Sequence, residues 1–99
     1  MYASVTTFHV APDALAEVVR LGQEVMLPGM QDHPGFVGYY ALADRATGKV
    51  VSVSLWESEA ARRARDASSA ARERAAALTP YLDAAAPRTS ERLEVVLRA

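Results

Sequence analysis

Four stretches of the chain place apolar side chains at alternate positions, which predicts β-strands because successive residues of a strand point to opposite faces. The residues between the second and third stretch end in Gly48, and glycine accepts the positive φ that a tight turn requires. The two middle strands therefore form a hairpin. The four stretches are SVTTFHV (4–10), FVGYYALAD (36–44), KVVSVSLW (49–56) and TSERLEVVLR (89–98).

Two other stretches repeat their apolar residues at helical spacing. The first begins at Pro12, which suits a first helical turn, and we expect it to end at Pro28-Gly29. The second follows Ser58, a good N-cap, and is rich in alanine and arginine. We expect a break at Ser68-Ser69 and an end at Thr79-Pro80.

The resulting order, β-α-β-β-α-β, predicts a single α+β domain over residues 1–99 with a ferredoxin-like antiparallel sheet. Right-handed connections place both helical segments on one face of that sheet. The chain has no further element to cover the other face, although the middle hairpin is apolar on both sides. We therefore expect a homodimer in which the two sheets pack face to face.

The third strand divides its side chains between these two faces. Val51, Val53 and Leu55 form a purely aliphatic face that suits the dimer contact, so Ser52, Ser54 and Trp56 should lie under the helices. A pocket there would suit a flat aromatic ligand, because its walls are aromatic and its polar groups few. The same small residues also permit close packing without any pocket. The expected lining is Trp56, Tyr40, Phe36, Ser52, Ser54 and Thr6, with Tyr39 on the dimer side.

Composition excludes several classes of function. The net charge of −1 does not suit a protein that grips nucleic acid or an anionic membrane surface. The chain has no cysteine, which removes disulfides, thiolate metal sites and cysteine nucleophiles. The N-terminus shows no signal peptide and no apolar run reaches the length of a membrane span, so we expect a soluble, cytoplasmic protein. Motifs for nucleotide cofactors, serine hydrolysis and zinc proteolysis are absent.

Three further side chains are candidates for chemistry. His33 lies in the connector before the hairpin, where an imidazole with a pKa near neutral can act as a general base toward a phenol, although such loop histidines are often only solvated. Arg62 follows Trp56 by six residues, so its guanidinium is a candidate to hold a phenolate or carboxylate. His9 lies near the end of the first strand, at the dimer contact or the pocket rim. The two histidines lack a carboxylate at ligand spacing, and we expect no metal site.

The segment HPGFVGYYALADRATGKVVSVSLWESEAAR resembles the antibiotic biosynthesis monooxygenase family of dimeric α+β barrels. Pro34-Gly35-Phe36 and Trp56-Glu57-Ser58 carry the resemblance, and the order of elements agrees over the whole chain. The resemblance implies a cofactor-independent monooxygenase in which an aromatic phenol or quinol, as in polyketide pathways, is deprotonated and its anion reacts directly with O₂. The alternative is a non-catalytic ligand-binding or accessory dimer of the same fold.

The resemblance also implies roles for individual residues. Trp56 matches the pocket tryptophan of the small oxygenases, whereas Ser52 and Arg62 stand where those enzymes have an asparagine and a tyrosine. A later arginine assists in those enzymes, and Arg72 or Arg74 takes that place here. The haem-degrading branch uses a histidine on its second helical segment, and this chain has no histidine after His33. The implied catalytic residues are Trp56, Arg62 and His33, and the implied substrate-binding residues are Ser52, Ser54, Tyr40, Phe36 and Arg72.

Overall fold

The predicted hairpin is formed by β2 (Phe36–Asp44), an edge strand, and β3 (Lys49–Trp56) in a computed structural model that describes all of residues 1–99. β1 (Tyr2–His9) pairs with β3 on one side and with β4 (Thr89–Glu94) on the other. The strand order is β2-β3-β1-β4, and every neighbouring pair is antiparallel. This is the ferredoxin-like sheet that the sequence predicted.

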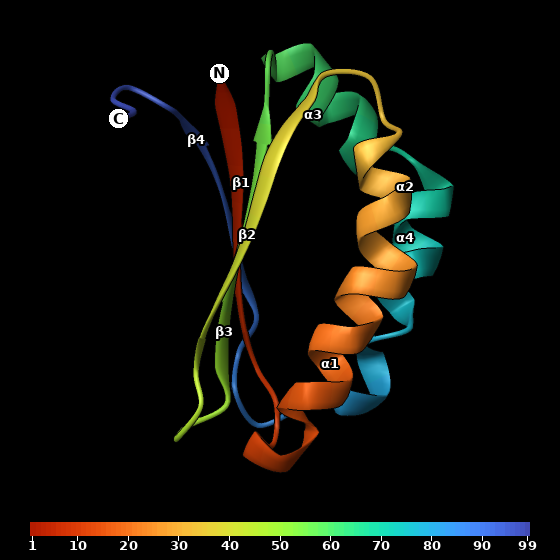
Figure 1. Ribbon diagram of the computed structural model, residues 1–99, viewed down its shortest axis with the longest axis vertical. Helices are drawn as coiled ribbons and strands as arrows, with labels where there is room; N and C mark the ends of the chain where they lie inside the picture. Colours follow the sequence, from red (N-terminus) through yellow and green to blue (C-terminus); the bar gives the residue numbers. More distant parts are fainter.

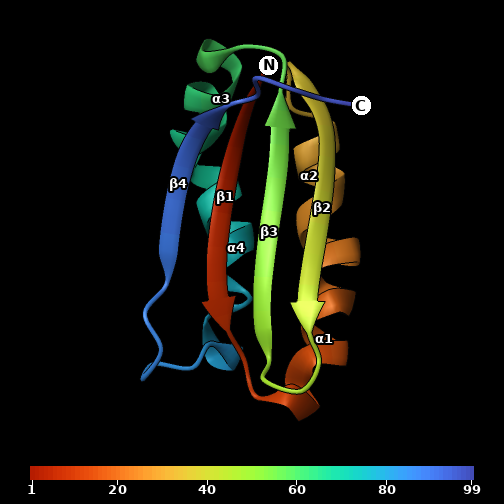
Figure 2. The same cartoon turned by 90° about the vertical axis from the view of Figure 1, so that its left-hand side faces the viewer.

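All helical segments cover one face of the sheet, as predicted, and the other face is bare (Figures 1 and 2). None of these helices combines the length and the apolar character that crossing a membrane requires. The first group consists of η1 (Pro12–Ala14), α1 (Leu15–Leu21), η2 (Gly22–Met26) and α2 (Leu27–Gln31). The second group consists of α3 (Glu59–Asp66), α4 (Ser69–Ala76) and η3 (Thr79–Tyr81).

The first helical group continues past Pro28-Gly29, so the predicted end there is wrong. A π-helical turn, η2, precedes α2, and the backbone N–H of Leu27 bonds back to the carbonyl of Gly22. Pro28 then falls in the first turn of α2, where a missing N–H costs little. The last strand is shorter than predicted, since β4 ends at Glu94 rather than at Arg98.

A β-bulge in β2 changes which tyrosine faces the helices. Phe36 pairs with Trp56 but Gly38 already pairs with Leu55, so one extra residue is inserted at Val37. Beyond the bulge the alternation is reversed relative to Phe36, and Tyr39 pairs with Ser54 on the helix side. Tyr40 lies on the bare face and is 61% exposed. The prediction that Tyr40 shares a face with Phe36, and Tyr39 the opposite one, is therefore wrong.

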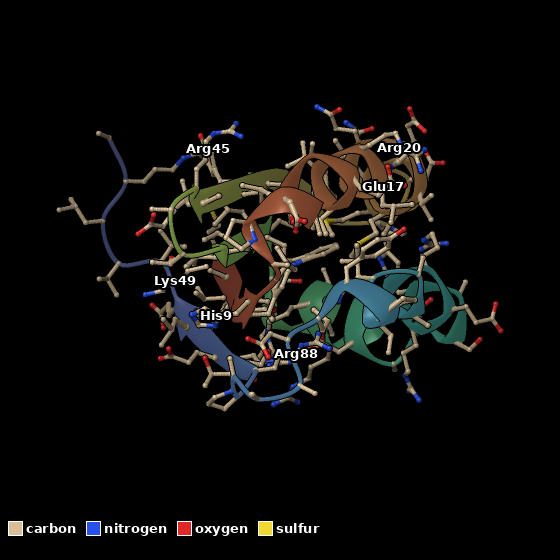
Figure 3. All side chains as sticks on the ribbon, turned by 90° about the horizontal axis from the view of Figure 1, so that it is seen from below. His9, Glu17, Arg20, Arg45, Lys49 and Arg88 are labelled. Carbon is tan, nitrogen blue, oxygen red and sulfur yellow. The ribbon has the colours of Figure 1, made fainter.

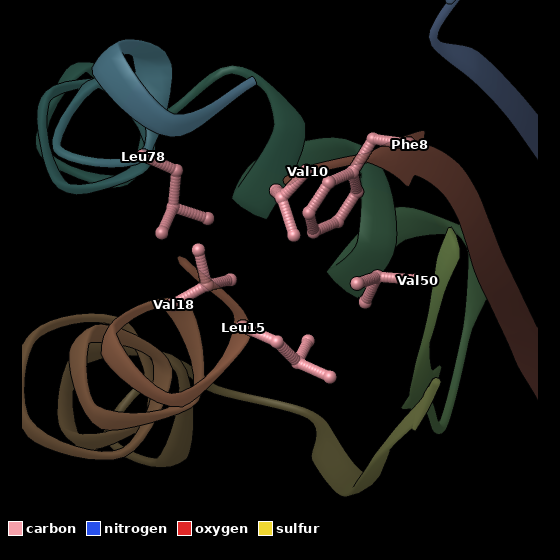
Figure 4. Packing of buried hydrophobic residues seen from close by; sticks show 6 residues of the cluster. All are labelled: Phe8, Val10, Leu15, Val18, Val50 and Leu78. Carbon is pink, nitrogen blue, oxygen red and sulfur yellow. The ribbon is translucent and has the colours of Figure 1, made fainter. Parts of the chain in front are cut away.

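The hydrophobic core occupies only one end of the space between sheet and helices. It joins the end of β1 and the start of β3 to α1 and to the residues after α4 (Figure 4). The hairpin turn closes over this end, because Gly48, at φ +78°, accepts a backbone hydrogen bond from Val10. The opposite end, around Trp56, is lined by more polar side chains. The core residues are Phe8, Val10, Leu15, Val18, Val50 and Leu78.

Candidate functional site

Trp56 is the last residue of β3 and is fully buried at the corner between the sheet and α3. Ser58 begins α3 two residues later, and its hydroxyl accepts a hydrogen bond from the backbone N–H of Ala61 at 3.1 Å. This cap turns the chain sharply after the strand. The indole is thereby directed under the helices rather than along the edge of the sheet.

His33 is brought against this tryptophan by the connector before β2. Gly35 has φ +83°, and its carbonyl accepts a hydrogen bond from the backbone N–H of Glu57 at 2.9 Å. A side chain at position 35 would also collide with Ala61. Glycine is therefore required both for the positive φ and for the lack of space. The ring of His33 meets the ring of Trp56 edge to face, with centroids 5.7 Å apart. Phe36 approaches the same indole at 5.7 Å in a similar geometry.

Hydroxyl groups line the sheet beside the indole. The indole Nε1–H of Trp56 donates to Ser54 Oγ at 3.0 Å. Ser4 pairs with Ser54 across β1 and β3, and its Oγ is buried without any hydrogen-bond partner. Buried polar atoms normally have partners, so the Ser4 hydroxyl is free to bind a ligand or a water molecule. Ser52 and Thr6 extend this row toward the middle of the sheet.

Tyr39 adds a phenol that sequence reasoning placed on the other face. Burial raises the pKa of Tyr39 above its usual range, and the Ser52 hydroxyl and the positive charge of Arg65 oppose this rise. Burial also lowers the pKa of the Arg65 guanidinium, and the charges of Asp66 and Tyr39 oppose that change. At neutral pH the site thus holds a protonated phenol beside a cation.

Arg74 closes the space above these groups. Its guanidinium lies directly on Gly29 of α2, where an added Cβ would collide with Arg74 Cζ. The remaining cavity beside it has a volume of only about 10 Å³. That volume admits one water molecule but no aromatic ring. An arginine side chain is long and flexible, so its movement can enlarge the space. The cavity is lined by Met26, Gly29, Met30, His33, Arg65, Ala71 and Arg74.

The structure brings together five of the predicted site residues, namely Trp56, Phe36, His33, Ser52 and Ser54. The other three, Tyr40, Arg62 and Arg72, are placed elsewhere, and Tyr40 lies on the bare face. Arg62 is held by carboxylates of its own helix, with Asp66 at 3.0 Å and Glu59 at 3.8 Å. Arg72 is exposed, and its guanidinium donates to the backbone carbonyl of Ala67 at 3.4 Å. Of the two arginines considered for one role, Arg74 rather than Arg72 lines the cavity.

Sequence reasoning missed Tyr39, Ser4 and Arg65. One signal was available for Tyr39, because an isolated glycine within a strand, here Gly38, often marks a bulge. For Arg65 no signal was available, because the sequence does not distinguish it from the neighbouring Arg63. The side chain of Arg65 is only 25% exposed, against 71% for Arg63. No group of three or more histidine and carboxylate side chains is placed to hold a metal ion.

Comparison with known proteins supports the same fold and adds a family. The family model described as antibiotic biosynthesis monooxygenase matches residues 1–77. An uncharacterized protein of Mycobacterium tuberculosis is 33% identical over 64 residues, which cover 65% of this chain. The match covers only 27% of that relative, so the chain spans about a quarter of its length.

Several solved structures have the same architecture over nearly the whole chain. A monooxygenase from Streptomyces coelicolor, in complex with the ligand nanaomycin D, aligns with a TM-score of 0.79 and 24% identity, covering 99% of this chain and 92% of that one. A variant of a cofactor-independent oxygenase from Streptomyces nogalater aligns with a TM-score of 0.74 and 21% identity, covering 98% and 94%. A putative antibiotic biosynthesis monooxygenase from Deinococcus radiodurans reaches 0.78 at 15% identity, covering 100% and 96%.

Proposed function

The chain belongs to the antibiotic biosynthesis monooxygenase family, and on this premise we propose that it is a cofactor-independent monooxygenase that oxidises an aromatic phenol or quinol with O₂. The observation that carries the proposal is the partly buried phenol of Tyr39 beside Arg65, on the side of the sheet where Trp56 and His33 meet. Such a pair can stabilise negative charge on a substrate oxygen. The aromatic rings beside it suit a flat substrate.

The proposed reaction begins with loss of a proton from the substrate, for example from an anthrone. His33 takes this proton, and the Tyr39 hydroxyl and the Arg65 guanidinium stabilise the resulting oxyanion. The anion transfers an electron to O₂, and the two radicals combine to form a carbon–oxygen bond. The resulting peroxide anion takes the proton back from His33. Loss of the remaining proton from the same carbon, together with cleavage of the O–O bond, then yields a quinone and one molecule of water. One oxygen atom enters the product and the other leaves as water.

Substrate entry requires movement of Arg74, because the space it leaves is about 10 Å³. The helical segment beneath it contains the π-turn η2, and such turns are frequent at functional sites. Met26 and Met30 line the same space and have flexible side chains that can adapt to a ligand. These three side chains form the adjustable wall of the proposed pocket. The sheet with Trp56 forms its fixed wall.

The test is oxygen uptake by the purified protein with a panel of anthrones and quinols, without added cofactor. Tyr39→Phe should lower the rate about 100-fold, since one positioned donor contributes about this factor. Tyr40→Phe on the bare face is the matched control and should leave the rate unchanged. Uptake that is equal in both variants would contradict the assigned role of Tyr39.

The alternative function is a non-catalytic ligand-binding or accessory dimer. The closed state of the site favours it, because Trp56 is fully buried and the cavity is small. Tight binding of an anthrone or quinol without oxygen uptake would support this alternative. Absence of both binding and uptake would contradict both functions.

We also propose that the bare face of the sheet is the contact of a homodimer, as the sequence predicted. That face carries large apolar side chains, including Leu42 at 56% exposure and Leu93 at 49%. Exposed apolar surface of this kind is unusual on a monomer and commonly marks an interface. Val53 lies near its middle, paired with Val5 on one side and Tyr40 on the other.

A further inference from the structure

A second and larger cavity lies at the opposite end of the sheet from Trp56. β4 pairs with β1 only as far as Thr7, where Thr89 is its partner. The chain meets β1 again at Val10, which forms an isolated bridge with Leu82. Residues 84–88 lie away from β1 between these two points (Figure 2). The sheet therefore has an opening beside Phe8 and His9, and this opening is a cavity of about 290 Å³.

Four of the eight residues that line this cavity are apolar. Phe8 is 8% exposed and belongs to the core, and Leu82, Ala84 and Ala86 come from the segment that surrounds the opening. A cavity of this size is at the small end of the range for ligand sites. It accepts one compact ring but not a polycyclic phenol.

Two side chains of the lining carry nitrogen atoms that have no partner in the protein. His9 Nδ1 is buried and makes no hydrogen bond, which is uncommon for a buried polar atom. Arg88 takes part in none of the ion pairs or side-chain hydrogen bonds of the chain, and it lines the same cavity. Figure 3 shows His9 and Arg88 at this end of the molecule, with Lys49, the cross-strand neighbour of His9, beside it.

The one acidic group in the lining is Asp83. Its Oδ1 accepts a hydrogen bond from the backbone N–H of Ala85 at 2.9 Å, and its own N–H donates to the His9 carbonyl at 2.8 Å. Asp83 therefore shapes the segment around the opening, and its carboxylate is engaged with the backbone. Thr79 adds a hydroxyl to the lining. The groups left free to meet a ligand are a guanidinium and an imidazole.

We propose that this cavity is a second ligand site that binds a small carboxylate with one compact apolar ring. The ring would lie against Phe8 and Leu82, and the carboxylate would accept hydrogen bonds from Arg88 and, once the imidazole turns to expose its buried nitrogen, from Nδ1–H of His9. The site is distinct from the one at Trp56, since six residues of β3 separate Val50 from Trp56, which is about 20 Å along a strand. It does not depend on the proposed oxygenase activity.

The test is a titration of the full chain with benzoate. Binding is observed through the NMR signals of the backbone amides and of the tryptophan indole. We expect saturable shifts for Phe8, Leu82 and Ala84 with a dissociation constant of about 1 mM, as is common for so small a ligand. The indole N–H signal of Trp56 should not move. Benzamide, which is neutral and of similar shape, should bind about tenfold more weakly or worse.

Arg88→Ala should weaken benzoate binding about tenfold, and His9→Phe, which keeps a ring but removes the nitrogen, should weaken it severalfold. Arg72→Ala is the matched control, because Arg72 is an exposed arginine far from the cavity lining, and it should bind benzoate as the unmodified chain does. Equal affinity of Arg88→Ala would overturn the proposal. So would the absence of saturable shifts, or shifts centred on the Trp56 indole.

Discussion

The indole of Trp56 combines two roles that usually fall to different residues. It fills the corner between sheet and helix as a core residue does, with no exposed surface, and it also donates a directed hydrogen bond to Ser54. Its ring edges and faces meet His33 and Phe36. The orientation of the site thus depends on one side chain whose neighbours come from two separate segments.

We expect Trp56→Phe to lower the free energy of unfolding by about 3 kcal/mol, because a large side chain is trimmed and the Ser54 hydroxyl loses its donor. Ser54→Ala should cost about 1–3 kcal/mol, since it leaves the buried indole N–H without an acceptor. The double variant should cost less than the sum of the two. Urea denaturation of all four proteins measures this coupling, and strict additivity would contradict it.

Tyr39 should be recognisable by its titration. Because its pKa lies above the ordinary value of about 10, it should ionise later than a free tyrosine, and the ultraviolet absorbance of phenolate should show a late component that Tyr39→Phe removes. The folded state holds this proton more tightly than the unfolded state. The associated stability is therefore complete below about pH 10 and is lost as the pH rises through the pKa of the folded protein.

At the scale of elements, the break between α3 and α4 is set by one hydroxyl. Ser68 Oγ accepts a hydrogen bond from the backbone N–H of Ala71 at 3.2 Å, whereas the adjacent Ser69 caps nothing. Ser68→Ala should lower the free energy of unfolding by about 1 kcal/mol. Ser69→Ala is the matched control and should be neutral or slightly stabilising, because alanine favours the helix. Thermal unfolding of the two variants measures the difference. Equal losses of stability would contradict the assignment of Ser68 as the N-cap of α4.

The order of elements and the face of β3 were predictable because strong local patterns encode them. Ser52, Ser54 and Trp56 alternate with three aliphatic residues, and Ser58 caps the following helix as predicted. The bulge at Val37 was not predictable from alternation, since one inserted residue reverses every later position of the strand. That single shift explains why Tyr40 was assigned to the pocket in place of Tyr39.

The arginines of the site were beyond sequence reasoning for a different reason. Arg62, Arg65 and Arg74 have the same chemistry, and their roles depend on which helix face turns toward the sheet. Arg62 is bound by Asp66 and Arg65 is placed beside Tyr39 by the packing of α3 on the sheet. The helical course through Pro28 likewise depends on the π-turn before it, which has no simple sequence signature.

Across the whole molecule, the two ends of the sheet differ in the side chains that they place under the helices. The apolar cluster around Phe8 and Val50 stabilises one end, and the hydroxyl-lined region around Trp56 occupies the other. This separation leaves the polar end free to be chemically specialised without weakening the core. The bare face extends along the whole length of the sheet, from one end to the other (Figure 2).

Val53→Asp should prevent the proposed dimer, because it places a charge in the middle of the apolar face. Sedimentation should show a dimer for the unmodified chain and a monomer for this variant. Arg72→Asp, on the helix side, introduces the same residue at an exposed position and should remain dimeric. A monomer for the unmodified chain at micromolar concentration would contradict the dimer.

The contact between Arg74 and Gly29 makes the size of the candidate pocket a matter of a single methyl group. A methyl at position 29 cannot coexist with the guanidinium where it lies, and the displaced atoms belong to the far end of a flexible side chain, so the backbone need not yield. The absence of a side chain at Gly29 therefore allows Arg74 to occupy this position. In evolutionary terms, a change from glycine to alanine would move the guanidinium and change the space beside it without rebuilding the sheet.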